Sequence, residues 1–110
     1  MNVCFNGFGE NVLTFEKQGT IAAGDPVMVC GNGIVQKATG RFCGICTAVR
    51  NGFVTVQLSG YARASYTTAP SVGFSKLSAA SGKLNLDVSN GVEYLVLDVD
   101  TTAKTFGFIL

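Results

Sequence analysis

The alternation of apolar and polar residues along this chain predicts a protein made of short β-strands. Runs rich in Val, Ile, Phe, Tyr and Thr recur about every ten residues, between segments that hold Gly, Asn, Asp or Ser. No segment shows a convincing helical period. The expected fold class is therefore all-β: a small β-barrel or sandwich of about eight to ten short strands joined by tight hairpins. The predicted strands are residues 12–15, 26–30, 34–37, 42–49, 53–58, 61–65, 74–77, 84–88, 94–99 and 105–110.

Turn residues indicate which strands pair. Asn51-Gly52 is a strong hairpin signal because both residues tolerate positive φ, so the runs on either side of it are expected to pair. Gly31-Asn32-Gly33 predicts a second hairpin, and residues 100–104 close the last one. Residues 76–84 could form a turn of helix before Gly82; we expect a loop there.

The chain contains a faint internal repeat. Residues 42–58 and 94–110 are equally long, at an offset of 52, and each is an aromatic-led strand, a polar turn and an apolar strand that ends in Leu. Upstream, Asp25-Pro26 and Ala69-Pro70 each precede a strand, a glycine-bearing turn and another strand. Two explanations stay open: one supersecondary unit used twice, or the shared pattern of β-hairpins.

The two ends of the chain differ. Residues 105–110 predict a strand with Phe106, Phe108 and Leu110 on one face, tied into a sheet. Residues 1–11 mix aromatics with glycines and lack alternation, which predicts a flexible N-terminal arm ahead of a single β domain at 12–110. We expect this arm to order on a partner, with Phe5 and Phe8 as docking side chains.

Composition adds an expectation of self-association. The chain is 47% hydrophobic and 14% charged, whereas ordinary domains have about 25% charged residues. Large apolar surfaces on a soluble monomer are uncommon, so we expect a homo-oligomer. The charges are scattered and sum to +1, which argues against nucleic acid or an anionic membrane as the main partner. The first residues lack a secretory signal and no stretch has transmembrane length, so synthesis in the cytosol is expected.

The four cysteines are expected to be reduced thiols. Cys43 and Cys46 have the C-x-x-C spacing of zinc and redox sites, but there is no second such pair and no His. On a regular strand, residues three apart point to opposite faces. Burial as small apolar side chains is therefore favoured over a metal or redox pair.

Other motifs for chemistry are sparse. Without His, the common Ser-His-Asp and Cys-His systems are excluded. Asp98 and Asp100 lie two apart, so they could share a face as an acid–base pair or a cation site; a solvated strand end is the favoured interpretation. The glycines match no dinucleotide or P-loop fingerprint. No catalytic residue, metal ligand or cofactor is assigned.

One aromatic and basic stretch is typical of single-strand nucleic-acid platforms on small barrels. Tyr61, Arg63 and Tyr66 lie together, with Arg50 and Phe53 nearby in sequence. On a strand, Tyr61 and Arg63 share one face and Tyr66 takes the other. Ordinary strand or interface aromatics are the favoured interpretation.

Much of the chain from about Leu13 onward resembles the small capsid decoration (cement) proteins of tailed bacteriophages and prophages. The resemblance rests on residues 19–27 (GTIAAGDPV), 33–35 (GIV), 52–62 (GFVTVQLSGYA), 72–74 (VGF) and 82–84 (GKL). It implies a small β-barrel-like protein, often a trimer, that binds the outside of the expanded shell and braces it. It implies no enzyme and no cofactor, and it assigns no individual capsid contact here.

The expected function is that of a virion structural protein, most simply head decoration, with itself and the major capsid protein as partners. Two alternatives stay open. One is another virion module, for tail or fibre attachment; the other is a small-barrel domain that binds nucleic acid or carbohydrate.

Overall fold

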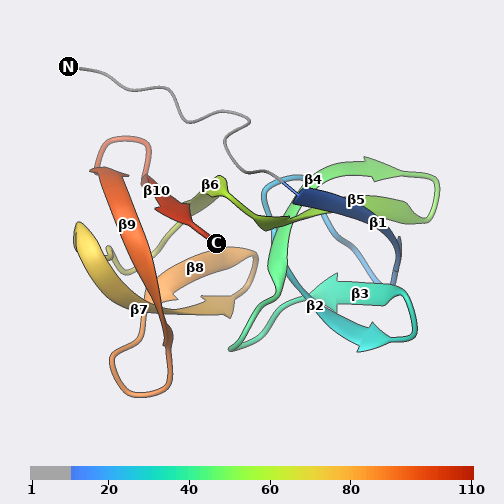
Figure 1. The fold of residues 1–110 in the computed structure, drawn as a ribbon, viewed down its shortest axis with the longest axis horizontal. Helices are drawn as coiled ribbons and strands as arrows, with labels where there is room; N and C mark the ends of the chain where they lie inside the picture. The colour runs from blue at the N-terminus through green and yellow to red at the C-terminus, as the bar shows by residue number, and fades with distance from the viewer. Residues whose placement is uncertain (1–10) are drawn as a thin grey trace.

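The computed structural model describes residues 11–110, which form ten β-strands and no helix (Figure 1). No helix that could span a membrane is therefore found in this part of the chain. The all-β prediction is confirmed. The strands are β1 Asn11–Lys17, β2 Pro26–Gly31, β3 Ile34–Lys37, β4 Gly44–Arg50, β5 Phe53–Ser59, β6 Tyr61–Ser65, β7 Gly73–Ala80, β8 Lys83–Leu86, β9 Val92–Asp100 and β10 Thr105–Ile109.

The strands form two halves that lie side by side along the long axis of the molecule (Figure 1). The barrel half, β1 to β5, is a closed barrel in the order β1-β3-β2-β4-β5. The sheet half, β6 to β10, is a five-stranded sheet in the order β6-β10-β9-β7-β8. The only residue between β5 and β6 is Gly60, whose φ of 92° glycine adopts at little steric cost.

The two halves share one strand order. When the strands are numbered within each half, the sheet has the order first, fifth, fourth, second, third. The barrel is closed, so β1 is also a neighbour of β5. Followed from β1 to β5 and onward, the barrel order is β1-β5-β4-β2-β3, which is the same. The last hairpins also match in detail. From each turn, three residue pairs precede a bulge, which skips Thr47 in β4 and Leu97 in β9. The internal repeat is thus present in the strand pairing.

The repeat differs from its predicted offset in one strand. The bulges align Cys46 with Val96, an offset of 50, whereas Val56 aligns with Phe108 at 52. The turn after β9 is two residues longer than the Asn51-Gly52 turn, which accounts for the change.

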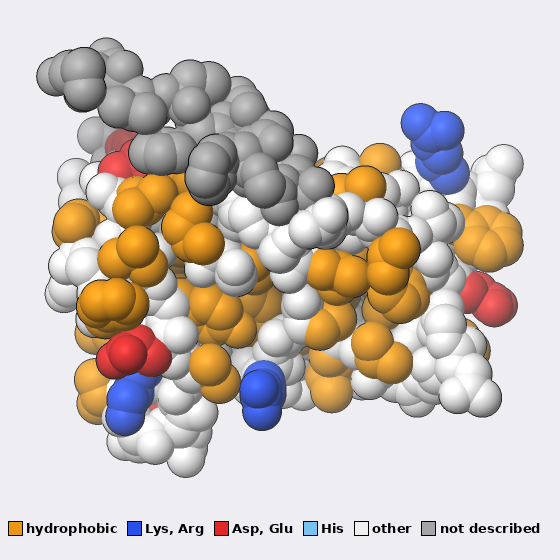
Figure 2. Space-filling model, in the orientation of Figure 1, with side chains coloured by type: hydrophobic (Ala, Val, Ile, Leu, Met, Phe, Trp, Pro, Cys, Tyr) orange, Lys and Arg blue, Asp and Glu red, His pale blue; other side chains and the backbone are white. Residues whose placement is uncertain are grey.

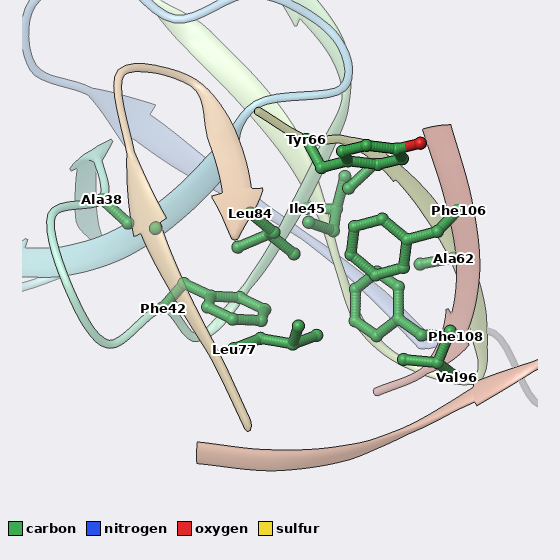
Figure 3. Packing of buried hydrophobic residues seen from close by; sticks show 12 residues of the cluster. Ala38, Phe42, Ile45, Ala62, Tyr66, Leu77, Leu84, Val96, Phe106 and Phe108 are labelled. Atoms are coloured by element: carbon green, nitrogen blue, oxygen red, sulfur yellow. The ribbon is translucent and has the colours of Figure 1, made fainter. Parts of the chain in front are cut away.

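The buried side chains form two clusters, one inside the barrel and one between the two halves. The barrel interior is filled by Ile21, Val27, Val35, Cys46, Val54 and Val56. The larger core lies between the inner face of the sheet and the side of the barrel. Figure 3 shows Phe106 and Phe108 of β10 directed into it, with Ile45 and Phe42 entering from the barrel half. Fully burying each phenyl ring contributes about 1.5–3 kcal/mol.

Aromatic contacts and one backbone bridge fasten the two halves together. Phe42 stacks on Tyr94 with ring centroids 5.1 Å apart. Gly40 of the barrel half exchanges two backbone hydrogen bonds with Ala79 of β7, at 2.6 and 2.7 Å. Leu110 packs against the larger core with Phe106 and Phe108, which confirms that these three residues share a face.

The expectation of a loop at residues 76–84 is wrong. Strands β7 and β8 pair through Ala80 and Lys83, and the tight turn at Ser81-Gly82 has φ values of 51° and 78°. Leu77 and Ala79 point inward and are buried. The predicted arm lies outside the described residues except for Asn11, which begins β1.

Candidate interaction surface

The outer face of the sheet half carries a row of apolar side chains that crosses four strands. Strand register places Tyr61 of β6 opposite Ile109, Ile109 opposite Leu95 of β9, and Leu95 opposite Phe74 of β7. We call these four residues the outer row. Phe74 is 72% exposed, and the other three are partly exposed. Residues directly opposite each other on one face of a sheet have Cβ atoms about 4.5–5.5 Å apart, so these four side chains form one row across the sheet.

A polar cluster borders the outer row on one side. Arg63 Nη1 lies 3.0 Å from Asp98 Oδ2 and donates to the Tyr61 hydroxyl at 2.9 Å, while Nη2 donates to Thr105 Oγ1 at 3.1 Å. Desolvation lowers the pKa of the Arg63 guanidinium, but hydrogen bonds to Asp98 and Tyr61 outweigh it, so that pKa is raised. Gly107 makes this possible, because a Cβ there would collide with the Tyr61 hydroxyl and the Asp98 carboxylate.

On its other side the outer row is bordered by a pair of opposite charges. Lys76 of β7 lies opposite Glu93 of β9, one outward position beyond Phe74 and Leu95. Both borders are therefore electrically balanced. In Figure 2, apolar side chains spread over both halves of the visible face and charged ones are few.

The barrel half has a separate hollow on its outer surface, where β1, β4 and β5 meet. It encloses about 320 Å³ and is lined by Thr14, Arg50, Phe53, Val54 and Thr55. Phe53 is 53% exposed and lies opposite both Glu16 and Arg50 in register. An aromatic face beside a guanidinium and two hydroxyls can stack on a planar or sugar ring and donate hydrogen bonds to it.

The predicted aromatic and basic stretch is divided by the structure. Tyr61 and Arg63 share the outer face, as predicted. Tyr66 points into the larger core, is buried, and lies against Phe106 with ring centroids 6.2 Å apart. The three side chains therefore form no common stacking platform. Arg50 and Phe53 come together instead in the barrel hollow.

The two cysteines of the C-x-x-C pair do not point to opposite faces. Cys43 precedes β4, and both it and Cys46 pack against the barrel core, because strand alternation does not apply before the strand begins. Burial is the largest influence on each thiol and raises the pKa of both. Cys30, Cys43 and Cys46 are free thiols, and the described residues contain no group of three or more metal-ligating side chains.

Asp98 and Asp100 face the same way but serve different partners. Asp98 binds Arg63, as above, whereas Asp100 Oδ1 accepts hydrogen bonds from the backbone N–H groups of Ala103 and Thr102, each at 3.0 Å. These hydrogen bonds, that of Ala103 first, lower the pKa of Asp100. Each carboxylate thus has a structural role here, and the geometry does not join them as an acid–base pair.

Phe5 and Phe8, the docking side chains predicted from sequence, lie outside the described residues. The outer row was not predicted, although Phe74, Leu95 and Ile109 were each placed on strands. Alternation within a strand predicts which face a side chain lies on. The register that aligns Leu95 with Ile109 depends on the bulge at Leu97. The predicted offset of 52 between the repeats does not reveal this bulge, because the offset between β4 and β9 is 50.

No protein family model, curated protein or solved structure matches this chain. Its function is therefore argued from its own residues.

Proposed function

We propose that this chain is a structural protein of a bacteriophage or prophage virion, a capsid decoration protein that binds and stabilises the shell as an oligomer. The observation that carries the proposal is apolar surface exposed on both halves. It includes Phe74 on the sheet half and Phe53 on the barrel half. A clamp between copies and a shell needs more than one adhesive face, and repeated contacts raise its avidity.

The charge distribution supports a structural partner. The formal net charge is +1, and the ionic pairs seen are local: Arg63 with Asp98, and Lys37 with Asp25 at 3.6 Å. Such a surface gives little long-range attraction to a polyanion. It suits contacts made by shape and apolar area instead.

The sequence phrases that resemble decoration proteins contain glycines whose backbone conformation favours glycine. All have positive φ, between 69° and 99°: Gly19, Gly24, Gly33, Gly52, Gly60, Gly73 and Gly82. Asp25 accepts a hydrogen bond from Ala22 N at 2.9 Å and so fixes the turn before β2. The resemblance therefore includes backbone positions that favour glycine. In this proposal the protein is made in the bacterial cytoplasm, is located in the virion, and docks on the major capsid protein with the help of Phe5 and Phe8.

The proposal is tested by co-sedimentation of the purified chain with expanded empty capsids. Saturable binding, and shells that resist heat better when decorated, are the expected results. A Phe5→Ala/Phe8→Ala double variant should bind more weakly, while Val88→Ala, a change at a side chain that is 71% exposed, should bind normally. A chain that stays in the supernatant at every ratio would contradict the proposal. Electron microscopy of labelled virions separates head decoration from tail or fibre attachment.

The barrel hollow favours a second candidate function, the binding of carbohydrate or single-stranded nucleic acid. Phe53 offers a stacking face and Arg50 a cation within one hollow. A glycan array and a titration with oligonucleotides test this function, with Phe53→Ala expected to abolish any binding found. Failure of every glycan and oligonucleotide to bind the wild-type chain would exclude it.

A further inference from the structure

The shared strand order gives the outer row a counterpart in the barrel half. The register there runs Val12 opposite Gln57, Gln57 opposite Ile45, and Ile45 opposite Pro26. Because the bulges of the two last hairpins correspond and the same strands pair, these four residues occupy the same positions as Tyr61, Ile109, Leu95 and Phe74. We call them the barrel row.

Three of the four residues of the barrel row are covered by the rest of the same chain, whereas Val12, at the end of the row, is 48% exposed. Gln57 and Ile45 are each only 4% exposed, and Pro26 is fully buried. Ile45 packs into the larger core with side chains of the sheet half, and Gln57 Nε2 donates to the Tyr61 carbonyl at 2.6 Å. The fold therefore already shows this face of the repeat in its covered state.

At the three positions other than Tyr61 and Val12, the outer row is less covered than the barrel row, and it contains no amide side chain. Phe74 replaces Pro26 and is 72% exposed, and Ile109 replaces the polar Gln57. Removing apolar surface from water stabilises an association by about 25 cal/mol per Å². A partner that covers Phe74 and its neighbours would therefore remove more apolar surface from water, per residue, than the sheet half removes by covering the barrel row.

The borders of the outer row indicate which partner fits. Arg63 with Asp98 lies on one side, and Lys76 opposite Glu93 lies on the other, so each border carries both signs and no net charge. A strongly charged partner would find no complementary field there. A second copy brings the same flat apolar row and the same balanced borders, and two twisted sheets can pack face to face about 10 Å apart.

We propose that the outer row is the face through which a second copy of this chain packs, sheet against sheet. This inference rests on the proposed function and deepens it, since it names the contact that builds the oligomer. Capsid docking is then left to other surfaces of the molecule.

The test is the mass of the full chain in solution, measured by light scattering and sedimentation over a wide concentration range. The wild-type chain should have a multiple of 11.5 kDa. Phe74→Glu should weaken the association at least tenfold, because it places a carboxylate at the centre of the contact. Val88→Glu is the matched control, since Val88 is 71% exposed, lies outside the row, and receives the same charge; its mass should equal that of the wild type. Phe74→Ala, which adds no charge, should weaken the association less than Phe74→Glu, and circular dichroism checks that each variant is folded.

Two results would overturn the inference: a wild-type chain of 11.5 kDa at every concentration, or equal masses for Phe74→Glu and the wild type. Co-sedimentation with capsids separates this failure from failure of the proposed function. A monomer that binds capsids in a Phe74-dependent way would assign the outer row to the shell and overturn only the contact between copies. An oligomer that depends on Phe74 but ignores capsids would support the contact and contradict the decoration role.

Discussion

The two halves of the molecule have the same strand order, but one forms a closed barrel and the other an open sheet. The barrel half closes through parallel pairing of β1 with β3, whereas β6 and β8 form no ladder. Side-chain volume explains the difference. Val54 and Val56 point into the narrow barrel, and the corresponding residues of the sheet half are Phe106 and Phe108, whose rings need more room. The same pairing scheme thus gives a closed or an open form according to the size of its core residues.

The open form is what joins the molecule together. Because the sheet half does not close, its inner face can receive Ile45 and Phe42 from the barrel half, which fill the larger core beside Leu84 and Phe108 (Figure 3). The open form of the sheet half therefore provides the interface between the two halves.

The largest expected effect comes from emptying the larger core. Phe108→Ala should lower the free energy of unfolding by about 3–5 kcal/mol, because a ring-sized cavity opens where both halves meet. Val56→Ala, at the corresponding barrel position, removes two buried methyl groups and should lower the free energy of unfolding by about 2 kcal/mol. Urea denaturation measures both. If both variants lost the same free energy of unfolding, side-chain volume would not explain the difference between the halves.

Glycines at close contacts test the rigidity of each half. A Cβ on Gly44 would collide with the backbone carbonyl of Gln57 and lie 2.7 Å from Val56 Cγ1, so Gly44→Ala should destabilise the protein by about 1–3 kcal/mol. A Cβ on Gly107 meets only the ends of the Tyr61 and Asp98 side chains, which can move. Thermal unfolding should therefore show a clearly smaller loss for Gly107→Ala. The reverse order would contradict the geometry.

The gap between β6 and β8 is bridged by the Asn85 side chain and by a backbone hydrogen bond from Leu86 N to the Thr68 carbonyl at 3.3 Å. Asn85 Oδ1 accepts hydrogen bonds from Thr67 N at 2.6 Å and Thr68 N at 2.9 Å. Asn85→Ala should cost about 1 kcal/mol and speed hydrogen exchange at these two amides. Asn85→Asp keeps an acceptor and should preserve their protection. If exchange is unchanged in Asn85→Ala, the bridge does not hold the gap.

Acid should loosen the sheet half through two turns. Backbone N–H groups lower the pKa of Asp100, and those of Asn90, with the Ser78 hydroxyl, lower that of Asp87. A lowered folded-state pKa gives stability that is present above the unfolded value of about 3.9 and is lost as pH falls through the folded value. An Asp87→Asn/Asp100→Asn variant should therefore show a flatter loss of stability below about pH 4 in pH-dependent thermal unfolding. An acid response identical to that of the wild type would refute this assignment.

The sequence allowed all ten strands to be located, because their alternation is local. It misled at residues 76–84, where Ala79, Ala80 and Ser81 lack the bulk that marks a strand, although Leu77 and Ala79 alternate inward. The strand order depends on distant pairings that no local pattern encodes. The outer row escaped prediction for the same reason, since its alignment requires both the order of β6, β10, β9 and β7 and the bulge at Leu97.

The central place of β10 determines when each half can fold during synthesis. All barrel strands are available once Ser59 has left the ribosome, and β1 and β5 can then pair. In the sheet half, β10 lies between β6 and β9, so β6 has no neighbouring strand in the ladder until Thr105–Ile109 emerges. The barrel half can therefore fold before β10 has been made, and the sheet half that covers Ile45 is complete only once β10 has joined it.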